Sequence, residues 1–138
     1  MSLTLQVQPE TLAVCRLDAN AALPGWAMGG PFCALTRTAD ELSVICAQIS
    51  VPPGITCEPN WRALKVEGQL DFAMVGVLAG ISGALANARI SLFAVSTFDT
   101  DYILVKETDL PSALSALRSA GYGVKETKSQ RDDKSMSG

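Results

Sequence analysis

The sequence contains no histidine, which removes the commonest general base and the commonest metal ligand. Charged residues make up 18% of the 138 residues, below the usual quarter, and the net charge is −3. Nucleic-acid binding needs a basic stripe that contacts phosphates, and the sequence shows none. So few charges leave part of the surface apolar, which favours a protein partner, most simply a second copy of the chain.

Zinc-site spacing is also missing from the four cysteines, Cys15, Cys33, Cys46 and Cys57, which lie 18, 13 and 11 residues apart. Each has apolar neighbours, so we expect four small buried hydrophobes in a reducing compartment. The polar start of the chain gives no sign of a targeting segment. These features predict a cytoplasmic protein that holds no metal and no cofactor.

An uncharged run from Phe72 to Ala88 is the longest apolar feature and predicts a helix. Its 17 residues fall short of the roughly 20 that a membrane span needs, and its flanking strands fit a soluble sheet protein better. Met74, Val77, Leu78, Ile81 and Leu85 share one face at helical spacing. Because only Ser82 and Asn87 are polar, we expect the helix to be covered on two sides, by its own sheet and by something else.

The second half of the chain reads as strand, helix, strand, strand, helix, strand. Beyond the apolar run, strands are predicted at 63–67, 90–95, 102–105 and 122–125, and a second helix at 109–120. Asp109 is its expected cap, Pro111 lies in its first turn, and Gly121 follows its end. This order predicts an antiparallel four-stranded sheet with both helices on one face, the ferredoxin-like arrangement of an α+β protein.

The first half resembles a shortened copy of the second. Strands are predicted at 12–17, 32–38 and 42–47, with a short edge strand at 56–58 that Pro59-Asn60 should end. An offset of 60 residues places Leu35 on Val95 and Glu41 on Asp101. We therefore expect a degenerate N-terminal module at 1–60, a C-terminal module at 61–127 and a disordered polar tail at 128–138.

Three segments of the second half carry a resemblance to a known family. They are Asp71-Phe72-Ala73-Met74-Val75-Gly76-Val77-Leu78-Ala79, then Ile90-Ser91-Leu92-Phe93, and then the stretch from Ser96 to Val105. Together they resemble the ACT domain, in which a loop leads into a helix that opens with Gly-hydrophobic-Leu-Ala, followed by a strand. The Ser-Thr-x-x-x-Asp ending is similar to that of ACT modules in aspartate kinases, in the cytosolic arginine sensors of the CASTOR family, and in small bacterial proteins with two ACT repeats. Pro24-x-Trp26 and Gly29-Gly30-Pro31-Phe32 also look like those bacterial proteins.

The resemblance implies two tandem ferredoxin-like (βαββαβ) modules, the first degenerate, and a small effector bound at an interface between ACT modules. The implied pocket has two parts. One is the loop and helix start at Leu70, Asp71, Phe72, Ala73, Met74, Val75 and Gly76, and the other is the strand end at Ser96, Thr97, Phe98, Asp99 and Asp101. In arginine sensors the matching strand end supplies an aromatic residue and an acid, here Phe98 and Asp101. Met74 stands where those sensors carry an acid, so a cationic ligand side chain is not implied.

The chemistry of this corner is complementary to an α-amino acid. Amides at a helix start lack helical acceptors and suit a carboxylate, and Asp99 or Asp101 suits an ammonium group. Other interpretations stay open: Asp99-Thr100-Asp101 can be a simple turn, Phe98 can be ordinary core, and Asp71 can cap the helix amides.

We therefore expect a non-enzymatic regulatory or sensor protein, homodimeric, that binds an amino acid or a similar small molecule. The alternative is a structural dimerisation module with a vestigial pocket. An enzyme without histidine would depend on Asp99, Asp101 or a lysine, and we predict no catalytic residues.

Overall fold

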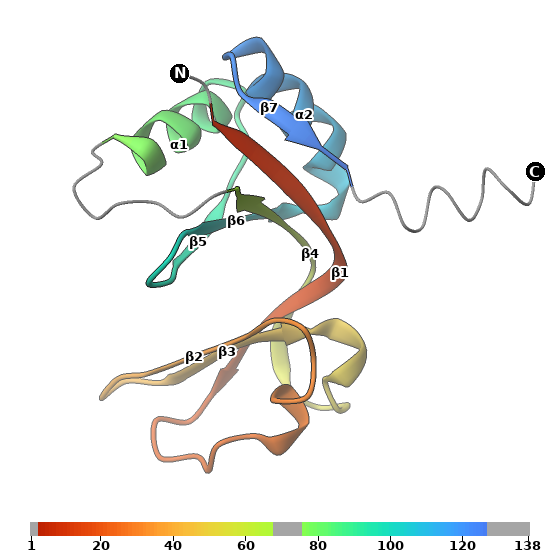
Figure 1. Cartoon of the computed structure of the whole chain (residues 1–138). Coiled ribbons are helices and arrows are strands. Elements are labelled where there is room, and N and C mark those ends of the chain that lie inside the picture. Colours follow the sequence, from red (N-terminus) through yellow and green to blue (C-terminus); the bar gives the residue numbers. More distant parts are fainter. Residues whose placement is uncertain (1–2, 68–75, 127–138) are drawn as a thin grey trace, which may run out of the picture. The chain divides into compact units, whose positions relative to one another are not determined.

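The computed structural model describes residues 3–67 and 76–126 (Figure 1). The chain divides into two compact units: unit 1 holds Met1–Pro9 and Arg62–Gly138, and unit 2 holds Glu10–Trp61. Two long strands, β1 (Thr4–Leu17) and β4 (Thr56–Val66), contribute residues to both units. Unit 1 is therefore assembled from two stretches of chain that are far apart in the sequence.

Unit 1 follows the order of elements that the sequence predicts after β4. In unit 1 the strands lie in the order β7-β1-β4-β6-β5, and both helices pack on one apolar core with them. These elements are α1 (Val77–Asn87), β5 (Phe93–Ser96), β6 (Asp101–Lys106), the 3-10 turn η3 (Glu107–Asp109), α2 (Leu110–Ser119) and β7 (Gly123–Lys125). The described part of unit 1 thus has an α+β architecture, in which two helices pack on a mostly antiparallel sheet.

The sheet of unit 1 differs from the predicted one mainly because β1 begins at Thr4 and joins it. We expected the last strand to complete a four-stranded antiparallel sheet, but β7 pairs in parallel with β1, with Leu5 opposite Val124. Leu5 and Val7 are buried and alternate with the polar Thr4 and Gln6, which is the pattern of a half-buried strand. The signal was present in the sequence, but the prediction began this strand only at Leu12.

The two helices bury the faces that their apolar spacing predicts. In α1, Ile81 and Leu85 are fully buried, with Val77 and Leu78 packed beside them. In α2, Leu114 and Leu117 are buried, with Leu110 against the same core. Met74 lies outside the described residues.

Glycines in a left-handed conformation flank the two helices, and neither helix start has a side-chain capping hydrogen bond. Gly76 precedes α1 with a φ of +80°, and Gly121 follows α2 with a φ of +99°, a left-handed conformation that favours glycine. Pro111 lies in the first turn of α2, as predicted. Asp109 occupies the predicted cap position, but its side chain makes no capping hydrogen bond there.

Unit 2 confirms the strands predicted at 32–38 and 42–47. In it, β2 (Cys33–Arg37) pairs with β3 (Leu42–Ala47), β3 pairs with β1, and β4 neighbours β1. Residues 10–61 contain no α-helix, only the 3-10 turns η1 (Gly25–Ala27), predicted around Trp26, and η2 (Gln48–Ser50). A second apolar core lies on one face of these strands.

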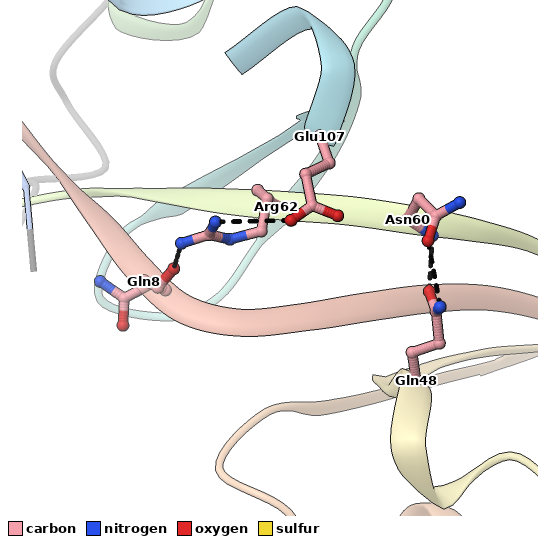
Figure 2. Close-up of polar contacts among 5 residues, drawn as sticks. All are labelled: Gln8, Gln48, Asn60, Arg62 and Glu107. Atoms are coloured by element: carbon pink, nitrogen blue, oxygen red, sulfur yellow. Dashed lines mark hydrogen bonds and ion pairs between the residues drawn. The ribbon is translucent and has the colours of Figure 1, made fainter. Parts of the chain in front are cut away.

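Pro59-Asn60 does not end a strand, which corrects the sequence prediction. β4 runs through both residues, and Asn60 takes a left-handed φ of 68°, which asparagine tolerates better than most residues. The Gln48 side chain holds it there: Asn60 N donates to Gln48 Oε1 at 2.6 Å, and Gln48 Nε2 donates to Asn60 Oδ1 at 3.1 Å (Figure 2). A side chain from η2 therefore satisfies the backbone where the strand deviates.

The hairpins β2–β3 and β5–β6 have the same construction, with a different offset from the predicted one. Arg37 pairs with Leu42 in one, and Ser96 pairs with Asp101 in the other, so equivalent residues are 59 apart rather than 60. A slip of one residue exchanges the two faces of a strand. Asp101 is therefore equivalent to Leu42, not to Glu41.

Candidate functional site

The β5–β6 hairpin carries the polar half of the predicted pocket. Thr97 N and Thr97 Oγ1 both donate to the carbonyl of Thr100, at 2.8 and 3.0 Å, and Thr100 N donates back to Thr97 Oγ1 at 3.1 Å. Beside this turn, Ser96 Oγ donates to Asp101 Oδ1 at 2.6 Å. The hairpin thus has a threonine-closed turn and, next to it, a separate serine–carboxylate pair.

Thr100 anchors the turn and was not among the predicted site residues. Its side chain is buried, at 5% exposure, and its Oγ1 donates to the carbonyl of Val66 on β4 at 2.7 Å. A buried hydroxyl needs such a partner, because an unsatisfied one is costly. The Ser-Thr-x-x-Thr-Asp pattern alone does not distinguish this structural threonine from a ligand-binding one.

Of the other predicted residues of the hairpin, Phe98 and Asp99 are exposed and Asp101 is half-buried. Asp99 lies in the middle of the turn and is exposed, which agrees with the turn interpretation that the sequence left open. Phe98 is 76% exposed, so the interpretation of Phe98 as core is wrong. Asp101 is half-buried at the start of β6, and its carboxylate is engaged by Ser96.

The loop half of the predicted pocket cannot be placed against this hairpin. Leu70, Asp71, Phe72, Ala73, Met74 and Val75 lie outside the described residues. Gly76 is described, as the residue before α1. The convergence of the loop with Ser96–Asp101, and the role of the loop amides, therefore stay predictions.

The β2–β3 hairpin closes with the same turn and lacks the serine–carboxylate pair. Thr38 N donates to the carbonyl of Glu41 at 2.9 Å, and Glu41 N donates to Thr38 Oγ1 at 3.2 Å. The positions of Ser96 and Asp101 are occupied there by Arg37 and Leu42. Closing this type of turn therefore does not require the Ser96–Asp101 pair.

Arg62 forms a second polar arrangement in unit 1, which the sequence gave no reason to single out. Its Nη2 donates to the carbonyl of Gln8 on β1 at 2.7 Å, and its Nη1 lies 3.9 Å from Glu107 Oε2 (Figure 2). The Arg62 side chain is 18% exposed, and its buried Nε has no hydrogen-bond partner in the described structure. Arg62 therefore links β4 to β1 through a hydrogen bond and makes a longer ion pair with Glu107 of η3.

The four cysteines all belong to unit 2 and to its core. Cys15 and Cys46 are buried, as predicted, whereas Cys33 and Cys57 are half-buried. Burial, with smaller contributions from the neighbouring thiols of Cys46 and Cys57, raises the pKa of Cys15 to about 12. Burial also raises the pKa of Cys46, with Cys33 the next contributor. Within residues 3–67 and 76–126, no three Cys, Asp or Glu side chains are placed to share a metal ion.

The described helices, α1 and α2 among them, lack the combination of length and apolar character that a membrane crossing requires.

Comparison with known proteins decides the family. The model described as the ACT domain matches residues 56–119, and a second model, described as an N-terminal domain, matches residues 10–54. A crystal structure of a protein from Agobacterium tumefaciens is 33% identical, with a TM-score of 0.87, over 92% of this chain and 95% of that one. The chain belongs to the ACT-domain family. Its resemblance to that family, predicted from the sequence, is confirmed.

This ACT-domain protein is similar to two kinds of named protein. The human "Cytosolic arginine sensor for mTORC1 subunit 1" is 38% identical over 65 residues, which are 46% of this chain and 20% of the sensor. The chain thus matches about a fifth of that relative's length. The regulatory subunit of aspartate kinase from Thermus thermophilus is 10% identical, with a TM-score of 0.59, over 85% of this chain and 97% of the subunit. The second likeness is one of fold.

Proposed function

We propose that this chain is a non-enzymatic, cytoplasmic sensor that binds an amino acid, or a similar small zwitterion, at an interface between ACT modules of two copies. In this proposal the two units are tandem modules, the first degenerate, and the chain works as a homodimer. Binding orders the ligand loop and so changes the interface that a downstream protein reads.

The Ser96–Asp101 pair carries the proposal. The same turn closes in the β2–β3 hairpin without a serine or a carboxylate at these positions, so the pair is additional to what the turn needs. Ser96 engages one oxygen of the carboxylate, at 2.6 Å, which fixes the orientation of Asp101. A fixed carboxylate suits an ammonium group through a charge-assisted hydrogen bond.

Neighbouring groups fit the rest of an amino acid. Phe98, exposed at the turn, offers an apolar surface for a side chain. For the carboxylate we propose the backbone amides of the loop from Leu70 to Val75, leading to Gly76, because amides ahead of a helix suit an anion. Asp71, Phe72, Ala73 and Met74 belong to the same proposed segment.

The names of the relatives point in the same direction. A stretch of an arginine sensor is similar to this chain in sequence, and a regulatory subunit of aspartate kinase is similar to it in fold. Histidine is absent and we assign no catalytic residue, which supports sensing over catalysis. We leave the side chain of the ligand open, because Met74 stands where arginine sensors carry an acid.

The test is a thermal-unfolding screen of the full chain against the standard amino acids, one at a time. A ligand at 100 times its Kd stabilises the fold by about 2.7 kcal/mol, which raises Tm by several degrees. Asp101→Asn keeps an acceptor for Ser96 and removes the charge. We therefore expect the variant to bind the ligand at least tenfold more weakly, while the Tm of the empty protein stays nearly unchanged.

The matched control is Asp40→Asn, an exposed acid in the turn of the equivalent β2–β3 hairpin. It should keep the affinity of the parent. If Asp101→Asn binds as tightly as Asp40→Asn, the assignment of Asp101 is wrong.

A structural dimerisation module with a vestigial pocket is the second candidate. The observation in its favour is β5, the last strand in the order of unit 1, where Phe93 and Ala94 are both exposed. A stable dimer that responds to none of the amino acids would support this candidate against the sensor.

A further inference from the structure

The strand register of unit 2 places Cys33, Cys46 and Cys15 on one face of the sheet, and Cys57 packs in the same core. Residues opposite one another in a pair of strands share a face, and alternate residues along each strand do so too. Cys33 on β2 lies directly opposite Cys46 on β3. Cys46 lies opposite Ala13 on β1, so Cys15, two residues further, is the diagonal neighbour of Cys46. All four thiols pack in the same apolar core, Cys57 of β4 included.

These thiols form a continuous row from one half-buried end to the other. Cys15 lies close enough to Cys46 and Cys57 for both thiols to raise its pKa, and Cys46 is paired with Cys33 across β2 and β3. The order across the sheet is therefore Cys33, Cys46, Cys15, Cys57, with the two buried thiols in the middle. Spacing along the chain, which excluded a zinc motif, gives no hint of this arrangement.

We propose that Cys33 and Cys46 are an oxidative modification site, at which a peroxide converts the two thiols into a cross-strand disulfide. Directly opposed residues of antiparallel strands have Cα atoms about 4.5 to 5.5 Å apart, inside the range of about 4.4 to 6.8 Å that a disulfide spans. Cys33 is half-buried, so it is the end of the pair that a small oxidant reaches.

A disulfide fits the row better than a metal ion does. A thiolate metal site needs its sulfurs to converge on one point at about 2.3 Å, usually with four ligands. No three cysteines or acids of the described structure converge in that way. Sulfurs that follow one another across strands meet in pairs, which is what a two-electron oxidation uses.

The reaction balances in two steps. A peroxide, written as hydrogen peroxide, oxidises the Cys33 thiol to a sulfenic acid and leaves as water. The Cys46 sulfur then attacks the Cys33 sulfur, the new S–S bond forms, the Cys46 proton is lost, and the sulfenic hydroxyl leaves as a second water. Two thiols and one peroxide give one disulfide and two waters.

The order of events follows from the environment of the two sulfurs. Burial raises the pKa of Cys46, which keeps it a thiol and a poor first nucleophile. It acts as the resolving group, because the sulfenic acid forms beside it on the opposite strand.

The test treats the folded full-length chain with hydrogen peroxide and maps disulfides by mass spectrometry after alkylation and trypsin digestion. Tryptic cleavage after Arg16, Arg37 and Arg62 leaves Cys33 in one peptide, and Cys46 and Cys57 together in the next. The Cys57→Ser variant therefore makes the result unambiguous, because a cross-link between these two peptides then requires Cys46.

We expect that cross-link in Cys57→Ser, and a fall from four to two free thiols in the parent chain. In Cys46→Ser the sulfenic acid has no resolving neighbour, so a dimedone adduct should accumulate on Cys33. Circular dichroism before oxidation checks that both variants are folded.

Three results would overturn the proposal. The first is that all four thiols remain free after treatment with hydrogen peroxide. The second is a disulfide that joins Cys15 and Cys57 while Cys33 stays reduced. The third is equal cross-linking in concentrated urea, which would mean that the strand register is not what pairs the two thiols.

Discussion

At the scale of single residues, the β5–β6 hairpin uses neighbouring polar side chains in different ways. Thr100 is buried and satisfied by the carbonyl of Val66, so it serves the fold. Ser96 and Asp101 bond to each other at a position where the equivalent hairpin has Arg37 and Leu42. The comparison between two hairpins of one chain separates the residues that the turn needs from those available for binding.

Cys15 gives a prediction of pH dependence. Its folded pKa, about 12, lies above the ordinary value near 9, so the unfolded chain loses its proton first as the pH rises. The stabilisation from the neutral buried thiol is therefore complete below pH 9 and is lost progressively as the pH rises toward 12. The slope is at most about 1.4 kcal/mol per pH unit for one thiol.

The measurement is urea unfolding under reducing conditions at pH 8, 9 and 10, for the parent chain and for Cys15→Ala. We expect the free energy of unfolding of the parent to fall more steeply over this interval than that of the variant. Equal slopes would show that the Cys15 thiol titrates alike in the folded and unfolded chain.

At the scale of elements, the three glycines before and within α1 have different surroundings. Gly76 takes a positive φ before the helix. A Cβ on Gly80 would lie 2.5 Å from Tyr122 Oη, whereas a Cβ on Gly83 would have no atom within 4 Å. The sequence predicted that something besides its own sheet covers this helix, and at Gly80 the nearest neighbour is Tyr122 of the same chain.

A double-mutant cycle tests the contact between α1 and Tyr122. Gly80→Ala should lower the free energy of unfolding by about 1 to 3 kcal/mol, the usual cost of overpacking. In a Tyr122→Phe background the nearest remaining ring atom is 3.9 Å away, so the same change should be neutral or stabilise by up to about 1 kcal/mol. Urea unfolding of the four proteins measures the coupling.

Gly83→Ala is the control on the same helix, because it adds a methyl group in open space and should stabilise the fold slightly. A loss of stability at Gly80 that is equal in both backgrounds would exclude Tyr122 as its cause.

At the scale of the whole molecule, β5 is the strand edge proposed for a partner. It ends the strand order of unit 1 and exposes Phe93 and Ala94, and exposed strand edges invite pairing with another chain. The low charge content of the sequence points the same way. Both observations support the homodimer in the proposed function.

The dimer prediction is that light scattering coupled to size exclusion gives twice the 14.5 kDa chain mass. A lysine on an edge strand opposes pairing, so Ala94→Lys should weaken the dimer at least tenfold. Thr36→Lys, an exposed site on β2 of unit 2, is the control and should leave the mass unchanged. A dimer that survives Ala94→Lys would place the contact away from β5.

The sequence by itself carried, in its motifs, the resemblance to the ACT-domain family. Periodicity and turn residues act over short distances, so they predicted the order of helices and strands after β4 and the buried faces of α1 and α2. It also predicted the strands β2 and β3 of unit 2. The missed features depend on contacts that periodicity does not report: the parallel pairing of β1 with β7, the continuity of β4 through Asn60, and the 59-residue offset of the hairpins. The β1–β7 pairing joins strands at opposite ends of the chain, the path of β4 through Asn60 depends on Gln48, and the offset depends on how each hairpin is paired.

Only the tertiary structure decided which polar and sulfur-bearing residues meet. Whether Asp101 faces Ser96, and whether Cys33, Cys46, Cys15 and Cys57 lie in one row, depends on how strands align side by side. A sequence reports which residues alternate along a strand, but a shift of one residue in pairing moves every side chain to the other face. For that reason composition and spacing predicted four separate buried thiols, and the sheet brought them together.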